Sequence, residues 1–471
     1  TSSGNVDGSG TACYLSVWSD TDTLSSSIAC ESAGLLSVAG ALSARNFCAS
    51  DSYNNQKWGV DALGNNTTGC YNTAIGPWAL YTNTAGCYNT AIGNSALNSN
   101  TEGDHNTAIG HDALRYNTTG CYNAAIGDSA LLCNTEGCYN AAIGCATLLC
   151  NTTGRGNTAI GQSALYGNTT GIYNNAIGPY VLQNNNGSYN NAMGYSALGA
   201  NTTGSYNAAI GSNALRYNTT GQYNNAIGNS ALKCNVAGYW NNAIGMYALY
   251  NSTSACYNNA IGYGALCDNT TGTDNNALGR CALYRNTTGN YNTAIGPSAL
   301  CSNTTGSFNT GIGYQSLLAN TEGAYNVAVG RWNLRSNTTG GCNVVMGNQS
   351  LLNNTIGNFN IALGYNTLGV NISGSSNTAI GCGALYNNTT ASGNQAIGNA
   401  ALYSNTTGQG NTAVGGQASY YNTTGSGNAA VGECALRMNT TGSCNIALGE
   451  SALYGSLTGD YNFAAGKNAL Y

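Results

Sequence analysis

The nineteen cysteines are the residues of this chain with the clearest chemistry, because thiols can be oxidised in pairs or can bind metal ions. Several are separated by 17 residues, namely Cys13 and Cys30, Cys70 and Cys87, Cys121 and Cys138, and Cys133 and Cys150. If 17 residues make one coil, the paired Cα atoms lie about 4.8 Å apart, which a disulfide accepts. We therefore predict disulfides between neighbouring coils and an oxidising compartment, with unpaired thiols as the alternative.

Metal binding and catalysis are poorly supported by the same residue types. The chain has only two histidines, His105 and His111, and no Cys-x-x-Cys motif, so the sequence predicts no metal site. The acidic residues are scattered and form no recurrent pair of the kind that general acid–base catalysis needs. The glycines lack the strand–Gly-x-Gly-x-x-Gly–helix context of a nucleotide site. We expect no enzymatic activity and no cofactor.

Asn-Thr-Thr recurs in the chain and matches the acceptor motif for N-linked glycans. The candidate asparagines are Asn66, Asn117, Asn151, Asn168, Asn201, Asn218, Asn269 and Asn439. The same Asn persists where the motif is broken, as at Asn83 and Asn100, which indicates that a turn needs Asn for its own geometry. Glycosylation is the second interpretation, and an inward Asn would exclude it.

These residues belong to a 17-residue repeat that runs from about Asn55 to Tyr471. Its consensus is Tyr-Asn-Thr-Ala-Ile-Gly-x-x-Ala-Leu-x-x-Asn-Thr-Thr-Gly-x, and 25 copies follow one another with one residue deleted between Ile177 and Met193. We number positions from the Ile as 0. Position +1 is Gly and position −3 is Asn in all 25 copies, while position +5 is Leu in 24.

The repeat predicts an all-β fold, a β-solenoid or β-roll of about 25 coils with two short strands per coil. Seventeen residues are too few for a helical-hairpin repeat, and two or more glycines fall in nearly every copy. Tyr-Asn-Thr-Ala-Ile predicts the first strand and Ala-Leu-Tyr the second, with turns at the Gly and Asn residues between them. Stacking predicts an Ile column inside the coil, an Asn amide ladder and a stack of aromatic rings at position −4.

The low variability of two neighbouring repeat positions, −1 and 0, indicates a partner chain. Ala at −1 and Ile at 0 are both nearly invariant, although adjacent strand residues point to opposite faces. We expect the Ala column to let another copy approach closely, giving a homo-oligomer and most simply a trimer. The alternative is that Ala serves tight packing within one coil.

Composition limits the other partners. Charged residues make up 6% of the chain and the net charge is −5, so no basic patch exists for nucleic acid. No apolar run approaches the roughly 20 residues of a membrane-spanning helix. The low charge and the cysteines together favour an extracellular location, secreted or on a cell or virion surface.

The ends of the repeat array differ from its middle. Residues 1–54 carry only fragments of the repeat, and we expect them to form a cap or an inter-subunit joint, because a solenoid end exposes unpaired strands. Residues 55–471 form the solenoid. The chain stops inside a repeat at Tyr471, which suggests that the last coil stacks on the N-terminal segment of another copy in a head-to-tail filament.

The motif Asn72-Thr73-Ala74-Ile75-Gly76-Pro77-Trp78-Ala79-Leu80 resembles the β-roll heads of trimeric autotransporter adhesins and the shaft repeats of phage tail-fibre proteins. The resemblance implies a trimeric extracellular fibre. The sequence thus favours a rigid, disulfide-stapled structural fibre subunit. An adhesin or tail-fibre shaft that contacts surface glycans through Tyr and Asn rows is the second hypothesis, and an ice-binding solenoid is a remote third.

Overall fold

The computed structural model describes residues 51–471 completely and the backbone of three N-terminal strands, β1 (Cys13–Trp18), β2 (Leu24–Ser32) and β3 (Leu35–Val38). These three strands form an antiparallel sheet in the order β1-β2-β3. Cys13 pairs with Glu31 and Cys30 pairs with Tyr14. Cys13 and Cys30 therefore lie on antiparallel neighbours rather than on successive coils, so the stacking argument for a disulfide does not apply to them. The other residues of the predicted 1–54 cap, apart from 51–54, lie outside the described part.

The repeat region is all-β and is divided between two compact units, Thr1–Tyr189 and Asn190–Tyr471. The first unit holds the repeat strands β4 (Gln56–Trp58), β5 (Thr73–Ile75), β6 (Thr90–Ile92), β7 (Thr107–Ile109), β8 (Ala124–Ile126), β9 (Ala141–Ile143), β10 (Thr158–Ile160) and β11 (Asn175–Ile177). The second unit begins at the 16-residue repeat. It holds β12 (Asn191–Met193), β13 (Ala208–Ile210), β14 (Asn225–Ile227), β15 (Asn242–Ile244), β16 (Asn259–Ile261), β17 (Asn276–Leu278), β18 (Thr293–Ile295), β19 (Thr310–Ile312), β20 (Val327–Val329), β21 (Val344–Asn348), β22 (Ile361–Tyr365), β23 (Thr378–Ile380), β24 (Gln395–Ile397), β25 (Thr412–Val414), β26 (Ala429–Val431), β27 (Ile446–Leu448) and β28 (Phe463–Ala465).

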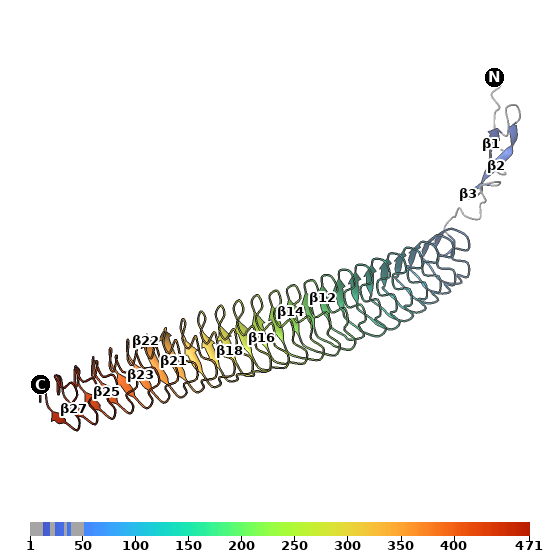
Figure 1. Ribbon diagram of the computed structural model, residues 1–471. Helices are drawn as coiled ribbons and strands as arrows, with labels where there is room; N and C mark the ends of the chain where they lie inside the picture. The colour runs from blue at the N-terminus through green and yellow to red at the C-terminus, as the bar shows by residue number, and fades with distance from the viewer. Residues whose placement is uncertain (1–12, 19–23, 33–34, 39–50) are drawn as a thin grey trace, which may run out of the picture. The chain divides into compact units, whose positions relative to one another are not determined.

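Within each unit every repeat strand pairs in parallel with the equivalent strand of the next coil. Thr73 pairs with Thr90 and Ile75 with Ile92 in the first unit, and the same register continues through the second unit to β28. Figure 1 shows the strands of the second unit following one another along one face of the stacked coils. The prediction of a 17-residue β-solenoid is confirmed.

The predicted second strand is wrong, because each coil in the described repeats carries one short strand and the Ala-Leu-Tyr segment is a turn. Leu80 in this segment has φ 51°, in the left-handed region, and the other leucines at +5 share this conformation. A left-handed conformation costs a non-glycine residue about 1–2 kcal/mol. The cost is offset because the Leu80 side chain is fully buried and its N–H donates to the carbonyl of Ala96 in the next coil at 3.0 Å.

The interior is built from Leu at +5, Ala at +4 and −1, and Asn at −3 and +8, and these positions are almost completely buried. The predicted Ile interior is wrong. Position 0 is exposed or half-buried, and its large exposed members range from 36% at Ile109 to 57% at Trp58. Gly311, which stands at position −1, shows the reason: a Cβ there would lie 3.3 Å from the Leu300 side chain. The coil is so thin that the inward strand position usually holds only the methyl group of Ala, and Val345 is the largest side chain buried there.

Gly at +1 is required by close contact between coils. Gly245 has φ +134°, and a Cβ there would lie 2.5 Å from the carbonyl oxygen of Gly262 in the next coil. The positive φ and the short Cβ contact would each make a larger residue costly at this position. The invariant glycine therefore sets the corner at which each strand enters the turn.

Candidate binding surface

The outer sheet face of each coil presents three rows of side chains to solvent. They are the Ile row at position 0, the −2 row of Thr, Asn, Ala or larger apolar residues, and the aromatic row at −4. The −2 and 0 residues share this face because strand side chains alternate, with −3 and −1 turned inward. The prediction that Ala faces a partner is therefore wrong: Ala lies inside, and the Ile row is the apolar surface.

The predicted aromatic stack is confirmed along the −4 row. Tyr71, Tyr88, His105, Tyr122 and Tyr139 stack with ring centroids 4.8–5.1 Å apart. His105 thus takes the place of a tyrosine inside the stack. His111 lies elsewhere on the surface, with its Nδ1 3.1 Å from Asp128 Oδ1. Offset ring stacking of this kind adds about 0.5–1.5 kcal/mol per pair beyond area burial.

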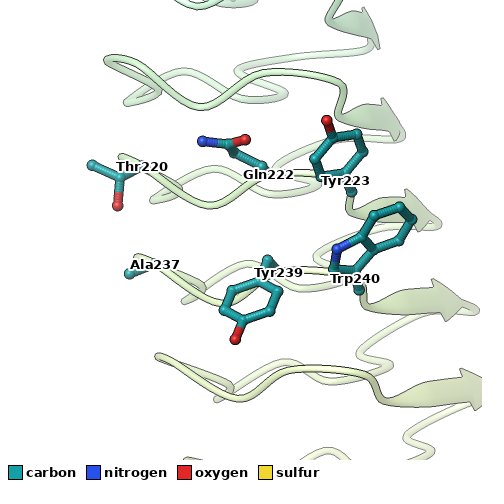
Figure 2. Close-up of a pocket in the computed structure, with 6 residues that line it drawn as sticks. All are labelled: Thr220, Gln222, Tyr223, Ala237, Tyr239 and Trp240. Atoms are coloured by element: carbon teal, nitrogen blue, oxygen red, sulfur yellow. The ribbon is translucent and has the colours of Figure 1, made fainter.

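Trp240 is the one tryptophan of the −4 row, and it lies where several surface hollows meet. Figure 2 shows one of them, in which Tyr223 and Trp240 lie side by side near the strands and Gln222 and Tyr239 precede them on the same coils. The two rings are stacked, with centroids 4.4 Å apart and planes 5° apart. Trp240 belongs to the −4 ring stack that the repeat predicts, but the repeat alone assigns it no binding role. The change from Tyr to Trp in an otherwise regular row was the available signal.

Two buried asparagine ladders hold the coils together, as predicted. In the −3 column the Asn72 Oδ1 accepts the backbone N–H of Asn89 in the next coil at 2.9 Å, while its Nδ2 donates to the carbonyl of Gly86 at 2.8 Å. In the +8 column Asn83 Nδ2 donates to Asn66 Oδ1 at 2.8 Å and to the same Gly86 carbonyl at 3.0 Å. Both columns therefore converge on the turn glycine.

The ladders bear directly on the glycosylation candidates. Seven of the eight are completely buried, and the half-buried Asn66 donates its Nδ2 to Gly69. The buried ones are Asn117, Asn151, Asn168, Asn201, Asn218, Asn269 and Asn439. N-linked glycosylation would require the amide nitrogen to leave the ladder and reach solvent. The inward orientation thus argues against these sites in the folded coils.

Several of the cysteine candidates are neighbours but are not bonded in the structure. Cys70 and Cys87 are free thiols whose Sγ atoms lie 2.8 Å apart. Cys138 Sγ accepts the backbone N–H of Cys121 at 3.1 Å, so these two are also adjacent. Cys133 and Cys150 occupy the +7 position of successive coils and are free. The stapling disulfides remain a prediction.

Oxidation should join Cys70 to Cys87 first. Two thiols would lose two electrons and two protons to oxidised glutathione, which becomes two molecules of reduced glutathione. We expect peptide mapping without reductant to recover a Cys70–Cys87 cross-linked peptide, and we expect the isolated Cys382 to stay alkylatable as a control. The staple should add about 3 kcal/mol to the stability of the first unit, since it closes a loop of roughly 17 residues. Recovery of alkylated Cys70 and Cys87 after the same treatment would contradict this.

Several thiols are poor nucleophiles, and Cys70 is one of them because its hydrogen bond with Cys87 raises its pKa. Burial raises the pKa of Cys121, Cys133 and Cys150, and it raises the pKa of Cys267 to about 11. A thiol whose pKa lies above neutral pH stays protonated and reacts slowly.

Within the described residues, no group of three or more His, Cys, Asp or Glu could hold a metal ion. The same part of the chain contains no helix with the length and apolar character needed to cross a bilayer.

Fold and surface together define a tandem-repeat β-solenoid with an apolar outer row. Comparisons of the chain with models of protein families, with curated proteins and with solved structures found no match.

Proposed function

We propose that this chain is a structural subunit of an extracellular fibre, in which copies associate in parallel through the Ile row to form a homotrimer. The observation that carries the proposal is the exposure of this row on an otherwise closed coil. Ile227, Ile244 and Ile261 are each 40–41% exposed on successive strands, although the Ala and Leu of the same coils are buried. A long apolar row on a soluble protein generally marks an interaction surface.

A second copy of the chain is the occupant that fits best. The row repeats with the coil spacing, so only a partner with the same axial spacing can match it throughout. An identical chain has that spacing by construction, and symmetric self-association is the usual outcome for soluble oligomers. The resemblance to trimeric β-roll fibres favours three copies.

Hydrodynamic measurements test the assembly. We expect the full chain to sediment at three times its 47.9 kDa mass. Changing Ile227, Ile244 and Ile261 together to Thr keeps β-branched residues in the strands and removes apolar area. This variant should keep its circular dichroism spectrum and dissociate at concentrations at which the wild type stays trimeric, with at least a 100-fold weaker association.

The matched control changes exposed apolar residues outside the Ile row. Ile372 and Leu457 occupy the turn position +9, where most copies carry Thr, and they are 47% and 54% exposed. Changing both to Thr should leave the sedimenting mass unchanged. A wild-type chain that sediments as a monomer at tens of micromolar would rule out the proposed assembly.

A further inference from the structure

The aromatic row of the second unit is interrupted between Trp240 and Tyr291. On one side Tyr206, Tyr223 and Trp240 form a continuous stack, with centroids 4.9 and 4.4 Å apart. On the other side the stack resumes at Tyr291, which lies 5.0 Å from Phe308. Two −4 positions lie between these stacks, and neither continues them.

The two intervening residues explain the interruption. Tyr257 does not continue the stack, and its ring lies edge-on to Tyr239 at 5.4 Å and 83°. Asp274 replaces the aromatic residue in the next coil. One ring face of Trp240 and one of Tyr291 are consequently left without a stacked partner among the described rings. Both side chains are about half exposed, at 50% and 54%.

A cleft of about 520 Å³ opens at this interruption. Trp240, Tyr257, Asp274 and Tyr291 line it from the −4 row. Its other wall is the −2 row, contributed by Asn242, Asn259 and Asn276. Three coil steps separate Trp240 from Tyr291, which is about 14 Å at the spacing of adjacent strands. The cleft is thus too long for one six-membered ring and suits a short chain of them.

The −2 wall is a third amide ladder, exposed rather than buried. Asn225 Nδ2 donates to Asn242 Oδ1 at 3.0 Å, Asn242 to Asn259 at 2.8 Å, and Asn259 to Asn276 at 2.9 Å. Asn242 and Asn259 each use one N–H and one oxygen lone pair in the ladder, so a second donor and a second acceptor of each remain for solvent or a ligand. Elsewhere the −2 row carries residues such as Thr293, Val344 and Ile361.

We infer that this cleft binds a neutral oligosaccharide. The apolar faces of sugar rings pack on exposed aromatic faces, while their hydroxyl groups need closely spaced donors and acceptors of the kind that the Asn ladder supplies. The Asp274 carboxylate is an acceptor for a pair of hydroxyl groups. No cationic side chain lines the cleft, so a uronic or sialic acid would meet the Asp274 charge without a compensating partner. Binding here is a function beyond the structural role proposed above. Because the −2 wall lies beside the Ile row on the same face, a dissociated copy exposes the cleft at least as fully as an assembled one.

The test uses the full chain in isothermal titration with four probes, namely maltohexaose, cellohexaose, chitohexaose and oligogalacturonate. We expect saturable binding of at least one neutral hexamer and none of oligogalacturonate. The Ile227, Ile244 and Ile261 triple Thr variant should bind at least as well as the wild type, so failure of the trimer and failure of the cleft give different results.

Two variants test the location of the site and are compatible with the backbone conformation of the coil. Trp240→Gly removes the platform at a position with φ 56°, which glycine adopts freely and which Gly156 occupies in another coil. Asp274→Tyr restores the usual residue of the row and fills the cleft. Each should weaken binding at least tenfold. Trp78→Ala changes another exposed tryptophan outside the −4 row and should leave binding unchanged. Absence of binding to every neutral hexamer, tight binding of oligogalacturonate, or equal binding by Trp240→Gly and wild type would overturn the inference.

Discussion

Gly245→Ala should destabilise the coils around β15 by about 3 kcal/mol, because the substitution adds a strained φ and a backbone clash. The added Cβ would lie 2.5 Å from the carbonyl oxygen and 2.7 Å from the carbonyl carbon of Gly262. Neither atom belongs to a flexible side chain, so the two coils must separate. Coil separation weakens the hydrogen bond from the Gly262 N–H to the Ile244 carbonyl, which measures 2.8 Å.

Hydrogen exchange with peptide-level resolution is the appropriate measurement. A solenoid coil is stabilised mainly by its immediate neighbours, so we expect faster exchange in the coils around Gly245 and little change near β28. Gly416→Ala is the control. Gly416 lies at +2 with a φ outside the left-handed region, and the nearest atom to its added Cβ is a Glu433 side-chain carbon at 4.0 Å. Unchanged protection around Gly245 in the Gly245→Ala variant would show that the coils can separate without cost.

Asn292→Ala should lower the free energy of unfolding by about 3 kcal/mol. A buried polar group without a hydrogen-bond partner costs about 1–3 kcal/mol, and this change leaves more than one such group. Asn292 is fully buried. Its Nδ2 donates to Asn275 Oδ1 at 3.1 Å and to the Gly306 carbonyl at 2.9 Å. Its Oδ1 accepts the backbone N–H of Asn309 at 3.0 Å, which would lose its acceptor. Asn399→Ala removes an exposed asparagine and should change the thermal midpoint by less than one degree.

Asn292→Asp distinguishes the contribution of the amide N–H donors from that of the amide oxygen acceptor. The carboxylate keeps the acceptor for Asn309 but loses both donors, and burial raises its pKa above the roughly 3.9 of an exposed Asp. The folded state then binds the proton more tightly than the unfolded state, so stability falls as the pH rises above about 4. We expect Asn292→Asp to be closer to wild type at pH 4 than at pH 7 in chemical unfolding, whereas Asn292→Ala should show the same deficit at both. Equal deficits for the Asp variant would contradict the proposed hydrogen-bonding role.

The repeat columns allowed much of the architecture to be predicted. A 17-residue period with invariant Gly and Asn predicts parallel coils, because only stacked copies place each column in register. The Asn ladder and the −4 ring stack follow from that stacking alone. The adjacency of Cys70 and Cys87 was also predictable, since one period separates them.

The candidate saccharide cleft was only partly visible in the sequence. Asn occupies the −2 position from Asn225 to Asn276 in four successive copies, and Asp274 breaks the aromatic column. The edge-on contact of Tyr257 with Tyr239 has one sequence signal, since Tyr239 is an aromatic residue at −5, where the neighbouring copies carry Gln222 and Cys256. Side-chain rotation depends on the space that neighbouring coils leave free, and that depends on the tertiary structure.

The sequence by itself determined the period, the parallel register and the residues that bond one coil to the next, because these follow from repetition and from backbone chemistry. Only the tertiary structure decided which of two invariant neighbours is inside. Alternation places Ala and Ile on opposite faces but does not say which face is buried. The narrow gap to the Leu row decides it: the Ala methyl fits there, and the larger Ile must face outward, where it becomes the surface available to a partner.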